Sequence, residues 1–152
     1  MATRSNRALL SCVREPRRFV PTAAWEDARQ VRGLAGEREA LAYLTACGWD
    51  IEAHRYRWGR HDLDLVARKG SLVAFVEVKT RRSLTRGSPV EAVGWRKRSI
   101  LGRIAEVWRL RHGRPGDEYR FDLVAIWERG RSQRQPWTGR YVLEHVADAW
   151  RL

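Results

Sequence analysis

Two stretches of the chain place apolar residues at steps of three and four, the spacing that keeps one face of a helix buried. The first runs from about Ala28 to Cys47, and Gly48 follows it as a C-terminal stop. The second runs from Ser88 to about Arg111 and ends before a loop rich in glycine and proline. We predict a helix over each stretch.

The second helix has the plainest start signal in the sequence. Ser88 stands at the N-cap position, Pro89 at the first helical position and Glu91 three residues after the serine. This spacing is typical of a capping box, in which the serine and the glutamate each bond a free backbone N–H. We therefore predict that the helix begins directly at Pro89.

The remaining apolar residues form short runs or alternate with polar ones, as in strands. The predicted strands are Trp49 to about Trp58, Asp62–Arg68, Leu72–Lys79, Tyr119–Glu128 and a last edge strand over Tyr141–Val146. A loop over residues 69–72 joins the second and third strands as a hairpin. The third strand reaches the fourth across the second helix, a connection long enough for a parallel pair. The predicted fold class is therefore α/β, a mixed sheet flanked by helices.

The chain has 152 residues, the size of one domain. Residues 1–24 carry several arginines without periodicity and read as a basic N-terminal arm, and residues 25–152 read as a single domain. No apolar run approaches the length of a membrane span or of a signal-peptide core, so no membrane association is expected. With two cysteines and no need for a disulfide, a cytoplasmic location is the default expectation.

The net charge of the chain indicates what kind of molecule the protein binds. Thirty basic and 18 acidic residues give a net charge of +12, which attracts polyanions, and nucleic acid is the natural candidate. The alternative is a general preference for arginine, because 27 of the basic residues are arginine and only three are lysine, Lys69, Lys79 and Lys97.

The hairpin carries the candidate chemistry. Its predicted cross-strand pairs, from the turn outward, are Ala67 with Ala74, Val66 with Phe75, Leu65 with Val76, Asp64 with Glu77, Leu63 with Val78, and Asp62 with Lys79. Both faces are apolar near the turn, and one face becomes charged at Asp64 and Glu77. Two facing carboxylates repel, and Mg²⁺ or Mn²⁺ would compensate them. Lys79, on the same side as Glu77, is placed to orient or deprotonate a metal-bound water, an arrangement suited to phosphodiester hydrolysis; the alternative is a solvated strand face.

Further motifs accompany this pattern at compatible spacing. They are Gly36-Glu37 with Ala40 and Tyr43-Leu44, Asp62 to Val66, Phe75 to Lys79 with Arg81, Gly87, Glu91-Ala92-Val93 with Lys97, and Arg120 to Val124. On these motifs, over about residues 33–126, the chain resembles the YraN-type family of bacterial proteins. That family is similar to PD-(D/E)xK nucleases of the restriction-endonuclease and Holliday-junction-resolvase class. The resemblance implies a restriction-endonuclease-like αβββαβ core.

The resemblance also implies roles for individual residues. Asp64 and Glu77 would bind the metal, Lys79 would handle the nucleophilic water, and Glu37 would reach in from the first helix as a further acidic ligand. The alternative for Glu37 is an exposed helix residue beside Arg38.

This sequence departs from the family pattern next to the site. His61-Asp62 stands where the family has Gly-Glu, which shortens one carboxylate. For Asp62 the candidate roles are an accessory part in the site or an ion pair with Lys79. For His61 they are a contact to a phosphate or a surface position without a role. For Asp122 we predict a structural partnership with nearby arginines.

Candidate nucleic-acid contacts flank the predicted cleft. They are Arg81, Arg82, Arg86, Arg96, Lys97 and Arg98, placed to bind phosphates without reading bases. Among the eight tryptophans, Trp58 is the candidate for base stacking, with core or rim packing as the alternative, while Trp95 and Trp108 fit helix packing and Trp49 a strand start.

The leading functional hypothesis is a metal-dependent endonuclease-like protein that acts on DNA, including branched or otherwise structured DNA. A nuclease core that acts on two strands is compatible with a homodimer. The alternatives are a non-catalytic nucleic-acid-binding module on a nuclease fold and an adaptor of a larger DNA-processing complex. Only the first requires the metal.

Overall fold

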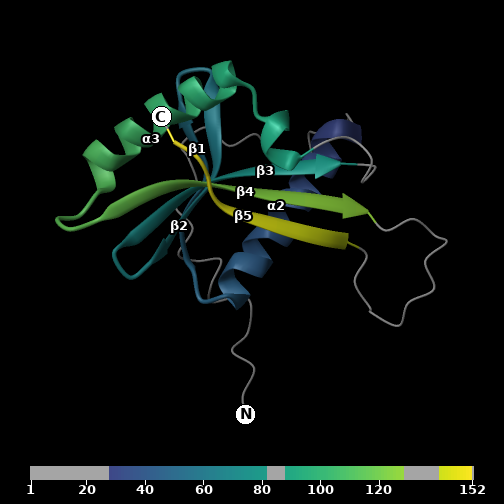
Figure 1. Ribbon diagram of the computed structural model, residues 1–152, viewed down its shortest axis with the longest axis horizontal. Helices are drawn as coiled ribbons and strands as arrows, with labels where there is room; N and C mark the ends of the chain where they lie inside the picture. The colour runs from purple at the N-terminus through teal and green to yellow at the C-terminus, as the bar shows by residue number, and fades with distance from the viewer. Residues whose placement is uncertain (1–27, 82–87, 129–140, 152) are drawn as a thin grey trace, which may run out of the picture.

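The described part of the protein is built on one twisted sheet (Figure 1). The computed structural model describes residues 28–81, 88–128 and 141–151. The strands, in sheet order, are β1 (Asp50–Trp58), β2 (His61–Lys69), β3 (Leu72–Arg81), β4 (Glu118–Glu128) and β5 (Tyr141–Trp150). β3 and β4 are parallel and the other neighbours are antiparallel, so the sheet is mixed. The predicted α/β class is confirmed, and the arrangement is consistent with a restriction-endonuclease-like core.

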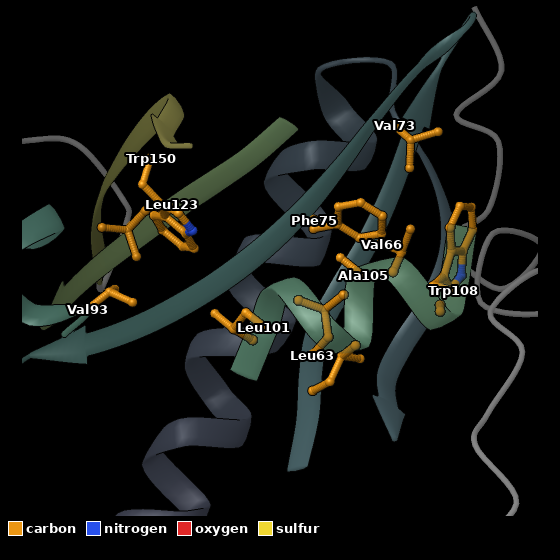
Figure 2. Close-up of a cluster of buried hydrophobic side chains, with 12 residues drawn as sticks. Leu63, Val66, Val73, Phe75, Val93, Leu101, Ala105, Trp108, Leu123 and Trp150 are labelled. Atoms are coloured by element: carbon orange, nitrogen blue, oxygen red, sulfur yellow. The ribbon is translucent and has the colours of Figure 1, made fainter. Parts of the chain in front are cut away.

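Two helices cover opposite faces of the sheet (Figure 1). α2 (Ala28–Ala46) packs Ala40 and Leu44 against one face, and α3 (Trp95–His112) packs Leu101, Ile104, Ala105 and Trp108 against the other. Figure 2 shows the second cluster, where Phe75 and Val66 of the sheet meet Trp108 of the helix. The sheet is buried on both faces, as the doubly apolar hairpin predicts.

The first helix ends as its sequence predicts. Gly48 has a φ of +87°, which glycine adopts without strain, and its N–H donates to the Thr45 carbonyl. The chain then enters β1 through buried Trp49, so the expected place of that tryptophan at a strand start is confirmed.

The second helix begins later than predicted. The segment after Ser88 forms only a short 3-10 helix, η2 (Pro89–Ala92), and the Ser88 side chain makes no capping hydrogen bond. α3 starts separately after extended Gly94. The turn between them is closed by Arg98, whose guanidinium donates to the Val90 and Val93 carbonyls at 2.9 and 2.8 Å. Because Val93 is buried in the core, the chain turns there and the capping-box prediction is wrong.

The hairpin register is confirmed from the turn to Leu65, which pairs with Val76, but the ladder stops there. Beyond this point the predicted pairing fails: Leu63 packs in the α3 cluster and Val78 in the α2 cluster, instead of sharing one face. The reason is that β2 retains only β1 as a partner, with Leu63 opposite Tyr56, and therefore follows the twist of β1.

The last strand is longer than predicted, because β5 continues past Val146 to Trp150, which pairs with Phe121. An irregularity in the ladder at Asp148, which has a φ of +49°, separates the two parts of the strand, so the alternation of apolar and polar residues does not continue through it.

The predicted basic arm over 1–24 lies outside the described residues. Neither α2 nor α3, the two α-helices that the structure describes, is long and apolar enough to cross a membrane.

Candidate active site

The candidate site lies where β2 and β3 part. At this point the Asp64 side chain substitutes for the missing ladder, because its Oδ2 accepts a hydrogen bond from the Val78 N–H at 2.7 Å. Burial raises the pKa of Asp64 well above its usual value, and the neighbouring Glu77 and Glu37 raise it further, against the lowering effect of the Val78 bond. An additional positive charge at this place would therefore stabilise the Asp64 carboxylate.

Glu77 on β3 is the most deeply buried of the predicted site residues, with 2% of its surface exposed. Its Oε1 faces two ammonium groups, Lys79 Nζ at 3.0 Å and Lys97 Nζ at 3.6 Å. Its Oε2 is buried and has no hydrogen-bond partner among the described residues. A buried carboxylate oxygen without a partner is costly, so this oxygen calls for a water, an ion or a ligand atom as its partner.

A polar pocket of about 390 Å³ brings the predicted residues together. Its lining comes from α2, β2 and β3 and consists of Gly33, Glu37, Asp64, Glu77, Val78, Lys79 and Thr80. The helix approaches the strand closely here, because a Cβ at Gly36 would collide with Thr80 Oγ1. Glycine at this position therefore lets α2 bring Glu37 to the pocket wall.

Glu37 is held by two basic side chains of β1. The Arg55 guanidinium donates to both carboxylate oxygens, at 2.8 and 2.9 Å, and His54 Nε2 donates to Oε2 at 2.7 Å. Burial alone would raise the pKa of Glu37, but the bonds from His54 and Arg55 outweigh it and hold this pKa below the usual value. Glu37 is buried, so the alternative of an exposed helix residue is wrong.

The described residues do not gather three or more Asp, Glu, His or Cys side chains into one metal-binding group. Asp64 and Glu77 line the pocket together, whereas both oxygens of Glu37 are already engaged. Two carboxylates still suit a hard cation such as Mg²⁺, which is commonly held by one or two carboxylates together with water and substrate phosphate. The unpartnered Glu77 Oε2 is the observation that fits such an ion.

The comparison with known proteins decides the family. The family described as "Uncharacterised protein family UPF0102" matches residues 36–126, more than half of the chain. The chain belongs to this family. A UPF0102 protein of Chlorobium phaeobacteroides is 39% identical over 118 residues, covering 78% of this chain and 91% of the relative. A UPF0102 protein of Rhodococcus jostii is 40% identical over 118 residues, covering 78% and 94%. The predicted YraN-type resemblance is thus confirmed.

Within this UPF0102 chain, the predicted nucleic-acid contacts divide into different groups. Arg98 holds the turn before α3 and lies over the Trp150 ring, so it has a structural role. Arg96 is exposed and its guanidinium lies over the Trp95 ring. Arg81 ends β3, while Arg82 and Arg86 lie outside the described residues.

Lys97 belongs to the site itself, because its Nζ faces Glu77. Sequence reasoning placed it among the phosphate contacts and missed this. The signal was available, since lysine is rare in the chain and Lys79 and Lys97 are two of only three. The clamp of His54 and Arg55 on Glu37 was also missed; Arg55 has a φ of +52°, a backbone state with no clear sequence signature here.

The positions next to the motif have plainer roles. His61 is exposed, and Lys79 pairs with Glu77 on its own strand, not with Asp62. Asp122 accepts a hydrogen bond from Arg120 at 3.0 Å, which confirms the predicted structural partnership with an arginine. Trp108 is buried as expected, but Trp95 is exposed, so its assignment to helix packing is wrong.

Proposed function

We propose that the protein is a metal-dependent nuclease that hydrolyses phosphodiester bonds in DNA. The observation that carries this proposal is the Glu77 carboxylate, which is buried beside Asp64 with one oxygen facing two lysines and the other without a partner among the described residues. A buried acceptor of this kind calls for a partner, and a bound cation would supply one.

Asp64 and Glu77 would hold Mg²⁺ or Mn²⁺ from adjacent strands, with Glu37 on the pocket wall as the third predicted acid. A bound cation of this kind supplies Lewis-acid polarisation of a phosphoryl oxygen and lowers the pKa of a bound water. The lysines engage only Oε1 of Glu77, so Oε2 stays available for such an ion.

The residues of the chain would divide the remaining work. Lys79 is part-exposed at the pocket, where its Nζ can donate to an attacking water or to a phosphate oxygen. Lys97 adds a second positive charge beside Glu77. Arg55 and His54 keep the buried Glu37 in place. The net charge of +12 supports DNA as the substrate, because phosphate contacts supply most non-specific affinity.

Cleavage of labelled duplex, single-stranded and four-way-junction DNA tests the proposal, with Mg²⁺ or Mn²⁺ and with EDTA. We expect cation-dependent cleavage by the wild type and a loss of at least about 100-fold in Glu77→Gln, as when an electrostatic catalytic group is removed. Glu106→Gln is the matched control, because Glu106 is an exposed glutamate paired with Arg109 on α3. Equal cleavage by wild type and Glu77→Gln, or none with any cation, would overturn it.

The second candidate is a non-catalytic nucleic-acid-binding module. It is favoured by Glu37, whose oxygens are engaged by Arg55 and His54, and by the lack of a three-acid group among the described side chains. It predicts DNA binding that weakens with salt and that Glu77→Gln leaves intact, without cleavage.

A further inference from the structure

An open hollow of about 770 Å³ lies beside the first turns of α3, outside the Glu77 pocket. Its lining is Trp58, Trp95, Arg98, Ser99, Gly102, Arg103, Glu106 and Arg151. Trp58 is 43% exposed and Trp95 is 75% exposed. Among the described residues, large apolar side chains are this exposed at only one other position, Leu110, and both tryptophans line the same hollow. Two exposed indoles therefore share one concave surface, where each can offer an aromatic ring to a ligand.

The charges around the hollow define the kind of partner. Glu106 is neutralised by Arg109, which donates to both of its oxygens, and Arg151 is paired with Asp148. Arg98 is turned inward onto backbone carbonyls. Arg103 is exposed and has no ion-pair or hydrogen-bond partner in the described part of the chain, so the hollow offers an uncommitted cation.

Gly102 has no side chain and so leaves the surface of α3 open at the hollow. Gly102 lies within α3 and lines the hollow beside Ser99 and Arg103. Glycine in a helix interior is destabilising relative to alanine, so folding alone does not favour it. With Gly102 and Ser99 in its lining, the hollow leaves room for a flat ligand beside the indoles.

The hollow lies close to the candidate site. Trp95 and Lys97 are both in the first turn of α3, and Lys97 Nζ is 3.6 Å from Glu77 Oε1. Trp58 ends β1 and pairs with His61, the residue that begins β2 and leads to Asp64. A DNA strand that places a phosphate at the Glu77 pocket would therefore have neighbouring nucleotides within reach of the two tryptophans.

We propose that this hollow binds unpaired nucleobases of a single-stranded segment, by stacking on Trp58 and Trp95 with Arg103 at the backbone; as a statement about the nuclease substrate it rests on the proposed function. Base–indole stacking needs a free face of the base, which single strands expose and duplex interiors do not. A second copy of the chain is a poorer occupant, because each copy carries +12 and brings an arginine to the contact.

Fluorescence anisotropy in EDTA tests the proposal without any cleavage. The probes are fluorescein-labelled 20-mer oligothymidylate and a blunt 20-base-pair duplex, each at several salt concentrations. Trp58→Ala and Trp95→Ala should each weaken oligothymidylate binding by about 5- to 150-fold, the range for loss of one stacked base, and duplex binding by less than about twofold. Trp95→Phe should retain most of the affinity, because phenylalanine also stacks.

Leu110→Ala is the matched control, because Leu110 is 72% exposed on the same helix but does not line the hollow. It should leave both affinities unchanged. Arg103→Ser should reduce the salt slope of oligothymidylate binding by about 0.7, the share of one phosphate contact on a single strand.

Three results would overturn the proposal. The first is unchanged oligothymidylate affinity in both tryptophan variants, and the second is an equal loss for duplex and single strand. The third is a wild-type dimer in sedimentation that Trp95→Ala converts to a monomer, since a second copy would then fill the hollow. Because the assay contains no divalent cation, these results are independent of the Glu77 cleavage test.

Discussion

The ladder of backbone hydrogen bonds is interrupted at two places in the sheet, each beside an aspartate, and the surroundings of the two aspartates differ. We call these two places the openings. Asp64 of β2 accepts the Val78 N–H of β3 at 2.7 Å, and Asp122 of β4 accepts the Asp148 N–H of β5 at 2.9 Å. Each carboxylate therefore takes a backbone donor from a neighbouring strand at an interruption of the ladder.

At Asp122, both carboxylate oxygens have hydrogen-bond partners. His145 and Arg120 donate to its other oxygen, and Tyr43 bonds the far nitrogen of the histidine. The opening at Asp64 instead contains Glu77, whose Oε2 has no partner among the described residues. Asp122 and Glu77 are about equally buried, but only Asp122 has a hydrogen-bond partner at each oxygen among the described residues. We therefore propose that Asp122 stabilises the fold and that Glu77 binds a ligand.

The largest expected effect is at the Asp122 opening. Asp122→Ala removes a fully buried carboxylate and leaves Arg120 and His145 without their shared partner. We expect the free energy of unfolding to fall by about 3 to 5 kcal/mol, as when one member of a buried ion pair is removed. Urea denaturation measures this free energy, and a loss below about 1 kcal/mol would contradict the structural role of Asp122.

The same opening predicts a pH dependence. Burial would raise the pKa of Asp122, but bonds from His145, the Asp148 N–H and Arg120 outweigh it and keep this pKa below its usual value. The unfolded aspartate has a pKa of about 3.9, so the stabilisation is complete above this pH and is lost as the pH falls through the lower folded pKa. The difference between wild type and Asp122→Ala should therefore shrink in acid. A difference that grows below pH 4 would contradict the sign.

An intermediate effect is expected at Glu37, which is buried like Asp122 but lies at the pocket. Glu37→Gln keeps the shape and removes the charge that Arg55 and His54 face. We expect a loss of about 1 to 3 kcal/mol, the cost of leaving a buried charged partner poorly satisfied. Glu39→Gln is the control, an exposed glutamate two residues along α2, and the two variants should differ clearly in urea.

The smallest stability effect is expected at Glu77 despite its burial. Its lysine partners are about one-third exposed, so water screens the pairs, and Glu77→Gln also removes the unpartnered anionic oxygen. We expect a change below about 1 kcal/mol in either direction. A loss of unfolding free energy as large as that of Asp122→Ala would show that Glu77 is a structural residue and would contradict the difference between the two carboxylates.

The sequence was sufficient where one local signal decides the structure. The hairpin register followed from alternation around the Lys69–Leu72 turn, and Gly48 marked the end of α2. It failed where a tertiary contact overrides a local motif. The Ser88 capping box did not form because buried Val93 and the Arg98 guanidinium fix a turn at that point.

The candidate site was predictable in part for the same reason. Asp64, Glu77 and Lys79 lie on the two strands of one hairpin, so the alternation predicted that they share a site, although the ladder stops at Leu65 and the predicted pairing of Asp64 with Glu77 does not form. Lys97 and Arg55 arrive from other elements, and no pattern within the hairpin reports the approach of α3 or the bent backbone of β1. Contacts between elements distant in sequence depend on packing that periodicity does not encode.

The most direct test of the account is thermal unfolding of wild type, Glu77→Gln and Glu106→Gln with and without Mn²⁺. A cation that binds only the folded protein stabilises it by about 2.7 kcal/mol at 100 times its Kd. We predict that Mn²⁺ raises the melting temperature of the wild type and of Glu106→Gln equally and leaves that of Glu77→Gln unchanged. An equal rise in all three proteins, or no rise in the wild type, would contradict the assignment of Glu77 as a metal ligand.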